Sequence, residues 1–253
     1  MKVTTTYELL ALQKAGHIAA QALNIAKRIV KVGMTTLELD KTIQDAIYQN
    51  GGLAAFKGHE GYKYASCISI NADVVHGVPS SDTTIHAGDL VSIDTGAICN
   101  GHYSDAAISF VIPPIHQYAL RLVNKTEQAL KAAIQASQPY ARIGDISRAI
   151  QQVAGSKGII KNYTGHCIGR ALHELPKIPN EMKPSESEED PYNFVLEPGM
   201  VIAIEPMFCL GTGDTFKKND GWTVTTTDNT LSAHCEHTVL ITLFGPVVLT
   251  ELK

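Results

Sequence analysis

Residues 88–94 of the chain read Gly-Asp-Leu-Val-Ser-Ile-Asp, and residues 199–205 read Gly-Met-Val-Ile-Ala-Ile-Glu. Each stretch begins with a turn glycine, continues as an apolar run typical of a buried strand, and ends on a carboxylate. In both stretches the carboxylate is the sixth residue after the glycine. Short apolar runs often coincide by chance, so this match indicates a duplication only if the surrounding elements repeat as well.

The elements predicted around these two strands do repeat. In each half of the chain two helices come first and strand-like segments follow, with Pro113-Pro114 between the halves. Thr5-x-x-Glu8 is a capping box that would open the first helix. The predicted helices cover residues 7–32, 36–49, 116–137 and 145–155, and the predicted strands cover residues 67–71, 90–97, 103–112, 201–208, 221–226 and 235–242.

Length and composition fit one globular domain. The chain has 253 residues, of which 44% are hydrophobic and 18% charged, and its formal net charge is −4. We expect a single α+β domain over 1–253, made of two similar halves at about 5–112 and 116–250. There is no basic tract, so neither nucleic acid nor an anionic membrane is an expected partner. Nothing in the sequence requires a second copy, so a monomer is the default expectation.

The cysteines and the N-terminal segment indicate a cytoplasmic location. The five cysteines are widely spaced and form no CxxC pair, which is typical of a reducing compartment. No apolar run follows Lys2, so we expect no signal peptide, and no stretch approaches the roughly 20 apolar residues of a membrane span. The acidic stretch 181–190 is predicted to be a solvated surface loop.

Asp94 and Asp105 are predicted to share one face of a β-hairpin. Asn100-Gly101 between them is a strong signal for a two-residue turn. With that turn Asp94 pairs with Ala107, so Asp105, two residues from Ala107, lies on the same face. The two carboxylates would then be diagonal neighbours, about 7–8 Å apart at the backbone. A shared cation would remove their repulsion; a strand-end Asp beside a solvated one is an equally good reading of this pair alone.

Two further acids favour the metal-binding interpretation. Glu205 ends the second copy of the duplicated strand, and Glu236 opens another apolar segment. Four enclosed carboxylates would need cations, and two divalent ions would neutralise them formally. Oxygen-rich ligation with a single imidazole suits Mn, Fe or Co better than a structural zinc site.

Three histidines are candidates for the remaining chemistry. His166 lies between Gly165 and Gly169, where glycines allow close approach of backbone and ligand, and His173 follows seven residues later. This is not the H-E-x-x-H zinc motif, so the two imidazoles need not share one task. His76 is predicted in a turn after a strand, and the residues alone do not separate an exposed turn histidine from a site group.

A series of short motifs follows in order along the chain. They are Ser69-Ile-Asn71, His76-Gly-Val-Pro79, the Asp94 and Asp105 hairpin, Gly165-His166-x-Ile-Gly169-Arg170, His173-Glu174, Pro198-Gly-Met200, Ile204-Glu205-Pro206 and Asp220-Gly-Trp222-Thr. In order and spacing this set resembles the type 1 methionine aminopeptidases over most of the chain. The resemblance implies the pita-bread fold, in which duplicated, pseudo-two-fold halves share a central antiparallel sheet flanked by helices.

The resemblance also implies a function and a ligand set. The family removes the initiator Met from nascent proteins by two-metal hydrolysis, with Co, Mn or Fe, or else Zn, as the divalent ions. By this resemblance Asp94 would chelate one metal, Asp105 and Glu236 would bridge both, and His166 and Glu205 would complete the other. Glu205 would also accept a proton from the attacking water.

The substrate-binding residues follow from the same resemblance. His76 and His173 would touch the substrate and stabilise the tetrahedral intermediate. Tyr62, Cys67 and Trp222 would line the Met side-chain pocket, where aromatic faces and sulfur suit a thioether; plain core packing is the alternative for these three. Two departures concern this pocket and no metal ligand: Leu172 stands where the family commonly has an aromatic residue, and His59 stands near a place often occupied by Tyr.

Two other functions are compatible with such a fold. An X-Pro aminopeptidase or prolidase would share it, although those enzymes usually carry a large additional N-terminal domain. A non-catalytic pita-bread binding module would share it too, but such proteins typically lose metal ligands, and all five are present here.

Overall fold

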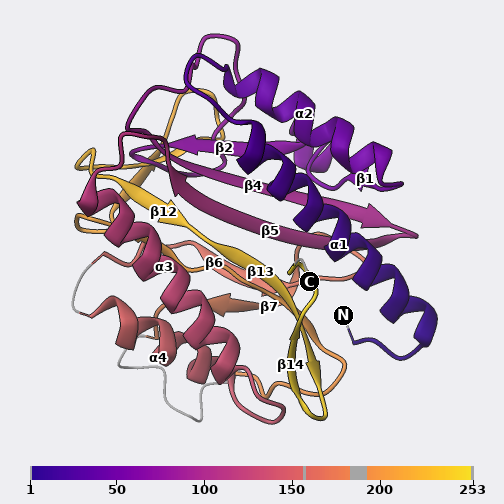
Figure 1. The fold of residues 1–253 in the computed structure, drawn as a ribbon. Coiled ribbons are helices and arrows are strands. Elements are labelled where there is room, and N and C mark those ends of the chain that lie inside the picture. Colours follow the sequence, from indigo (N-terminus) through magenta and orange to yellow (C-terminus); the bar gives the residue numbers. More distant parts are fainter. Residues whose placement is uncertain (1, 156–157, 183–192, 252–253) are drawn as a thin grey trace.

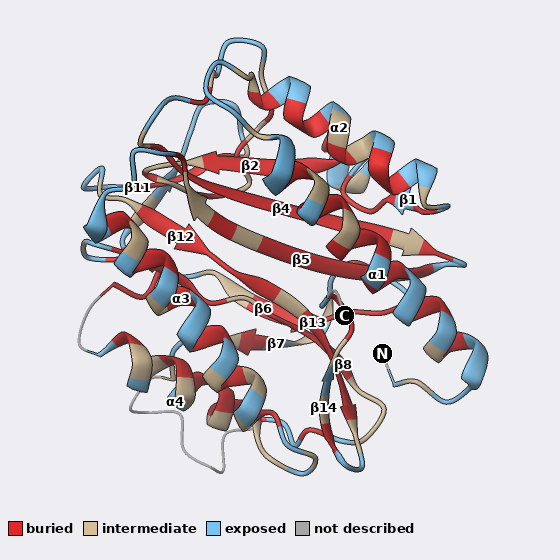
Figure 2. Ribbon diagram, viewed as in Figure 1, coloured by how far each residue is buried: buried red, intermediate tan, exposed pale blue. Residues whose placement is uncertain are grey.

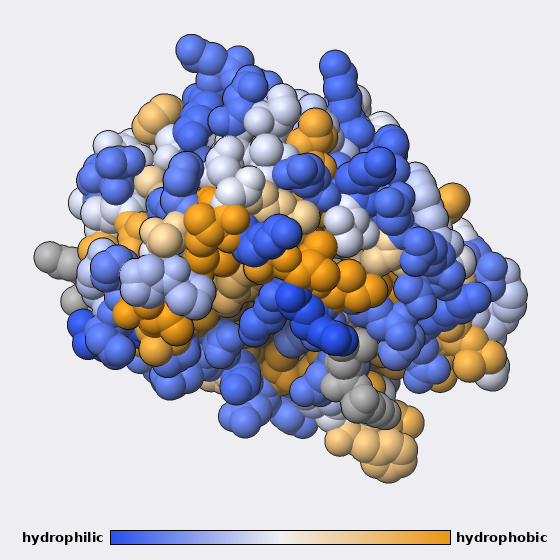
Figure 3. Space-filling view, turned by 45° about the horizontal axis from the view of Figure 1, so that its top comes forward, coloured by the Kyte–Doolittle hydropathy of each residue, from blue (hydrophilic) through white to orange (hydrophobic). Residues whose placement is uncertain are grey.

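The computed structural model of the protein describes residues 2–155, 158–182 and 193–251. Most of the predicted acidic loop at 181–190 lies outside these residues, so its prediction stays open. Within the described ranges, no helix has both the length and the apolar character needed to cross a membrane. Hydrophilic side chains cover much of the face shown in Figure 3, with apolar groups between them.

A capping box opens each of the first two helices, and the one at Thr5 is as predicted. In α1 (Thr6–Ile29) the Thr5 hydroxyl accepts a hydrogen bond from the Glu8 N–H, and the Glu8 carboxylate accepts one from the Thr5 N–H, both at 3.2 Å. The helix α2 (Thr36–Gln49) opens with the same reciprocal pair and has the predicted bounds. The predicted end of the first helix at residue 32 is wrong, because Val30 already has a ψ of 135° and leaves the helix.

A nine-stranded antiparallel sheet forms the centre of the fold (Figure 1). Its main path runs β1-β4-β5-β13-β8-β6-β7, while β2 pairs with β4 and β14 pairs with β13. The strands are β1 (Leu53–Ala54), β2 (Ser66–Ile70), β4 (Leu90–Cys99), β5 (His102–Val111), β6 (Thr164–Cys167), β7 (Glu174–Pro179), β8 (Val201–Ile204), β13 (Glu236–Thr242) and β14 (Gly245–Val248). The α+β fold with a central antiparallel sheet is therefore confirmed.

The β4–β5 hairpin has the predicted turn and register. Asn100 and Gly101 occupy the turn with φ values of 49° and 74°, as a type I′ turn requires of both central residues. Asp94 pairs with Ala107, and Gly96 pairs with Asp105. A slip of one residue would have turned one carboxylate to the opposite face.

The helices cover the sheet in two pairs. In Figure 1, α1 and α2 lie over the part formed by β2, β4 and β5, and α3 (Gln117–Ala136) and α4 (Ile143–Ala154) lie beside the part that contains β6, β7 and β13. Figure 2 shows the central strands buried almost throughout and the helices exposed on one side only. Two duplicated halves would produce this arrangement, and we retain the duplication as a proposal.

Two smaller sheets and one helical turn lie outside the main sheet. A three-stranded sheet contains β10 (Thr215–Lys217), β11 (Val224–Thr226) and β3 (Asp73–Val75), and β12 (Ser232–His234) pairs with β9 (Met207–Cys209). One turn of 3-10 helix, η1, covers His59–Gly61. The predicted strand at 201–208 is wrong as one element, because Glu205-Pro206 separates β8 from β9. The strand predicted at 221–226 begins only at Val224.

Candidate metal centre

Three carboxylates lie on one face of the adjacent strands β4, β5 and β13. Asp94 and Glu236 are both paired with Ala107 of the middle strand, from its two sides. Asp105 lies two residues before Ala107, so its side chain is on the same face. The exposed fractions of Asp94, Asp105 and Glu236 are 9%, 4% and 2%. The sheet therefore encloses three acids within one small volume.

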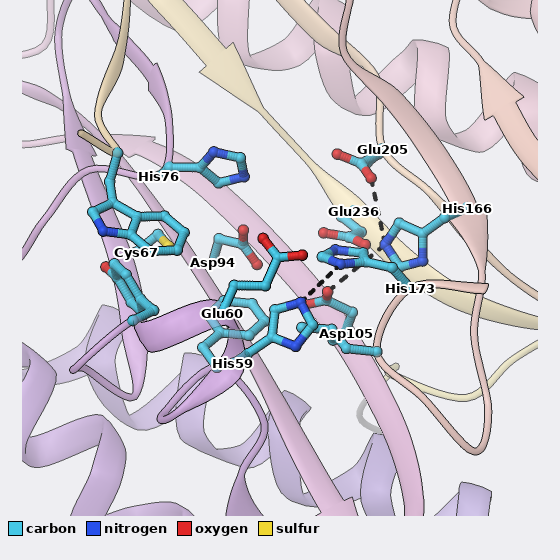
Figure 4. A pocket seen from close by; sticks show the side chains of 14 residues that line it. His59, Glu60, Cys67, His76, Asp94, Asp105, His166, His173, Glu205 and Glu236 are labelled. Carbon is cyan, nitrogen blue, oxygen red and sulfur yellow. Dashed lines mark hydrogen bonds and ion pairs between the residues drawn. The ribbon is translucent and has the colours of Figure 1, made fainter. Parts of the chain in front are cut away.

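The other half of the sheet contributes an imidazole and a fourth acid. His166 on β6 pairs with Ala203 on β8, and Glu205 directly follows β8. The His166 Nε2 atom lies 3.7 Å from Glu205 Oε1 and 4.0 Å from Asp105 Oδ2 (Figure 4). Gly165 allows β6 to lie this close to β8, because a Cβ atom at Gly165 would lie 2.3 Å from the Ala203 carbonyl oxygen. The structure thus brings together all five residues predicted as metal ligands.

The charge of this cluster requires compensation. Burial raises the pKa of all four carboxyl groups above the usual range, to about 7 for Asp105. Asp94 Oδ1, Asp105 Oδ1 and Glu236 Oε1 are buried and have no hydrogen-bond partner within the described part of the chain. Divalent cations would neutralise the acids and satisfy these oxygens together, so the residues present fit a metal centre.

His166 is in the form that a metal ligand needs. Its Nδ1 lies 3.0 Å from the Cys167 carbonyl oxygen, which can only accept, so Nδ1 carries the proton and donates it. The lone pair of Nε2 is then free on the side of the carboxylates. Burial, and next the neighbouring His173, lowers the pKa of His166 to about 4, so the ring is neutral at physiological pH.

The sequence reasoning missed His234. This residue is 1% exposed, and its Nε2 lies 3.6 Å from Glu205 Oε2 and 3.7 Å from Glu236 Oε2. Glu205, His234 and Glu236 form a second group able to hold a metal ion, beside that of Asp105, His166 and Glu236. A signal was available, since a His two residues before a strand-borne acid points to the same face.

An apolar pocket opens beside the carboxylates. Tyr62, Cys67 and Trp222 line it together with the acidic cluster, and the Tyr62 and Trp222 rings meet edge to face with centroids 5.0 Å apart. Leu172, the first departure from the family pattern, lines it as well and is 3% exposed. The pocket therefore has a charged end and an aromatic end that also contains sulfur.

Two further predicted histidines face this pocket. His173 and His76 both line it, and the rings of His173 and His166 are edge to face with centroids 4.6 Å apart. Burial lowers the pKa of His76 to about 4, and burial followed by His59 lowers that of His173. Both rings are therefore neutral near pH 7. His76 has a φ of 58°, which is uncommon outside glycine, and such strain often occurs at functional sites.

His59, the second departure, lines the pocket and hydrogen-bonds to His173. Its Nε2 shares a hydrogen bond of 3.1 Å with Nδ1 of His173 (Figure 4). Glu60 follows it with a φ of 47° and also lines the pocket. Sequence reasoning did not single out Glu60, and nothing in the motif around it marks it as a pocket residue.

In this α+β fold, the antiparallel sheet brings four acids and two imidazoles together beside a pocket, and this set of side chains could hold divalent metal ions. The chain belongs to metallopeptidase family M24, whose model matches residues 11–243. It is 42% identical to methionine aminopeptidase from Aquifex aeolicus, over 97% of this chain and 96% of the relative.

Two solved structures share the fold of this chain. That of methionine aminopeptidase from Thermotoga maritima superimposes with a TM-score of 0.93 at 38% identity, covering 100% of both chains, and the predicted pita-bread fold is thereby confirmed. Prolidase from Pyrococcus furiosus matches with a TM-score of 0.78 at 25% identity, over 99% of this chain but 66% of that one.

Proposed function

We propose that this protein is a methionyl aminopeptidase that removes the initiator methionine from nascent proteins and peptides by two-metal hydrolysis of the first peptide bond. The observation that carries this proposal is the two-ended pocket. Buried acids and imidazoles lie at one end, and Tyr62, Cys67 and Trp222 lie at the other, inside the same cavity. The similarity to methionine aminopeptidases over nearly the whole chain supports the same conclusion.

The proposed metal ligands are the five residues of the cluster. Asp94 would bind one ion, His166 and Glu205 would bind the other, and Asp105 and Glu236 would bridge them. The position of Asp105 and Glu236 supports their bridging role. Glu236 is paired across from the same residue as Asp94, and Asp105 lies within reach of His166. We propose Co, Mn or Fe as the ions, with Zn as a further option.

The chemistry needs a water nucleophile and a stabilised oxyanion. When bound, two divalent ions would lower the pKa of a water molecule, polarise the scissile carbonyl and hold the α-amine of the substrate. Glu205 would accept the proton of that water, since its carboxylate lies in the same cluster as the other proposed ligands. His76 and His173, which face the same cavity, would hydrogen-bond the substrate and its oxyanion.

The aromatic end of the pocket would accept the methionine side chain. A thioether packs favourably against aromatic edges and other polarisable groups. Burial raises the pKa of both Tyr62 and Cys67, so these side chains stay uncharged and present no ion to the thioether. The Tyr62 hydroxyl donates to the Ser66 carbonyl oxygen at 2.9 Å, which directs it away from a role as a free donor in the pocket.

The prolidase structure keeps the X-Pro peptidases as the second candidate function, because it shares this fold. Its chain is longer, since the match covers only 66% of it. For the remaining properties we propose a monomer in the cytoplasm, with a peptide or nascent-chain N-terminus as the partner.

A pair of peptides tests the function. Metal-stripped protein loaded with Mn²⁺, Co²⁺ or Fe²⁺ is incubated with Met-Ala-Ser and with Ala-Pro-Ala, and the released amino acid is quantified. We expect Met from the first peptide and no product from the second. Cleavage of Ala-Pro-Ala alone would assign the chain to the X-Pro peptidases. Metal binding without cleavage of either peptide would identify a binding module instead.

A further inference from the structure

His234 is a buried imidazole with an unpartnered nitrogen. Its Nε2 is buried and has no hydrogen-bond partner among the residues the structure describes. This atom lies 3.6 Å from one oxygen of Glu205 and 3.7 Å from one oxygen of Glu236. Such separations are long for hydrogen bonds. With metal–ligand bonds of about 2.1 Å, however, donor atoms on one ion lie roughly 3–4 Å apart. The three atoms are therefore spaced like donors of a single ion.

The backbone fixes His234 in this position. His234 ends β12 and Glu236 begins β13, and residues two apart on an extended chain share a face. His234 also pairs with Met207 on β9, and Glu205 lies two residues before Met207. Ser109 holds both backbone groups of His234, since its hydroxyl donates to the His234 carbonyl oxygen at 2.8 Å and accepts from the His234 N–H at 2.9 Å. Strand pairing and the Ser109 hydroxyl thus hold His234 beside the cluster.

His234 and His166 approach the same carboxylate from different sides. His166 Nε2 lies 3.7 Å from Oε1 of Glu205, whereas His234 is near Oε2. We propose that His234 is a sixth protein ligand of the metal centre and binds, through Nε2, the ion held by Glu205 and Glu236. This inference rests on the metal centre of the proposed function, not on its peptide substrate. A second imidazole would shift the site towards Co²⁺, Zn²⁺ and other ions that prefer nitrogen over purely oxygen ligation.

Cadmium NMR tests this assignment directly. Protein stripped of metal and reloaded with ¹¹³Cd²⁺ shows scalar couplings between the ion and ring protons only through a metal–nitrogen bond. We expect two coupled histidines in the unmodified protein and one in His234→Gln, with Cd²⁺ affinity lowered about 10- to 100-fold. His237→Gln is the matched control: its ring bonds Thr250 through Nδ1, and it should keep both couplings and full affinity.

The outcomes distinguish the sixth-ligand proposal from the proposed peptidase function. A single coupled histidine in the metal-loaded unmodified protein would overturn the proposal, and so would unchanged Cd²⁺ affinity in a folded His234→Gln variant. The count in the unmodified protein needs no substitution, so misfolding of the variant leaves the test intact. Two couplings in a protein that cleaves neither Met-Ala-Ser nor Ala-Pro-Ala would uphold the sixth ligand and reject the peptidase. Absence of bound Cd²⁺ would reject both.

Discussion

Asp94 and Glu236 face each other across one residue, since both are paired with Ala107, Asp94 from β4 and Glu236 from β13. This relationship joins the two parts of the chain, because β5 and β13 meet at the middle of the sheet. A carboxylate pair held by strand pairing cannot move apart to relieve its repulsion. It must be protonated or neutralised by a cation.

The first prediction is that Asp105→Asn or Glu236→Gln abolishes turnover. Each change removes a proposed bridging oxygen and one negative charge from the cluster while it keeps the side-chain shape. A metal centre supplies several kcal/mol of transition-state stabilisation, so we expect kcat/KM on Met-Ala-Ser to fall by about 10³-fold or more. Metal content, measured by elemental analysis, should fall as well. Full activity in either variant would refute the two-metal site.

A second prediction separates catalysis from ligation. His173→Ala should lower kcat by about 10²- to 10³-fold, the usual effect of losing one donor to an oxyanion, while metal content stays unchanged. His59→Ala should have a smaller effect, because His59 lines the pocket but acts on the oxyanion through the ring of His173, to which it hydrogen-bonds at 3.1 Å. If His173→Ala lost its metal, His173 would be a ligand and its assigned role would be wrong.

The third prediction concerns the metal-free protein. Burial raises the pKa of Glu236 in the folded state, so its contribution to stability is present below its unfolded pKa and is lost as the pH rises. The buried histidines have lowered pKa values, so their contribution to stability increases as the pH rises. This increase is complete at about pH 6.5, the pKa of an unfolded histidine. Between pH 6.5 and 8 the melting temperature of the metal-free protein should therefore decrease.

Glu236→Gln provides the control for this pH effect. Without metal at pH 8, the variant should melt higher than the unmodified protein, by about 2–4 °C for each kcal/mol of repulsion removed. Added Mn²⁺ should stabilise the unmodified protein and leave the variant nearly unchanged. A melting temperature that rises from pH 6.5 to pH 8 without metal would contradict the repulsion on which the site is argued.

The sequence predicts the carboxylates of this site better than the histidines around them. Asn100-Gly101 sets the hairpin register, and a period of two then determines which side chains share a face. That logic correctly united Asp94 and Asp105. The same period of two relates His234 to Glu236, so the sequence also places this imidazole on the face of the acids. Strand periodicity does not predict contacts between distant segments. One example is the His59–His173 hydrogen bond, which joins residues 114 positions apart.

The fourth prediction addresses the aromatic end of the pocket. Trp222→Ala would remove a pocket wall and the edge-to-face contact with Tyr62. Losing apolar contact with a substrate side chain costs about 1–3 kcal/mol, so kcat/KM on Met-Ala-Ser should fall about 10- to 200-fold. Metal content should be unaffected. Phe244→Ala, at a side chain that is 99% exposed, is the control and should change neither value. Equal losses in both variants would make Trp222 a stability residue.

The last prediction ties backbone packing to metal binding. A Cβ atom at Gly165 would lie 2.3 Å from the Ala203 carbonyl oxygen, a distance that forces β6 away from β8. Because His166 is the next residue, Gly165→Ala should lower metal affinity and cost about 1–3 kcal/mol of stability. Gly33→Ala carries the same substitution at a positive φ of 87° with open space around it, so it should lose some stability and keep its metal. If both variants lost stability equally and both bound metal fully, the close approach of β6 and β8 would not be what positions His166.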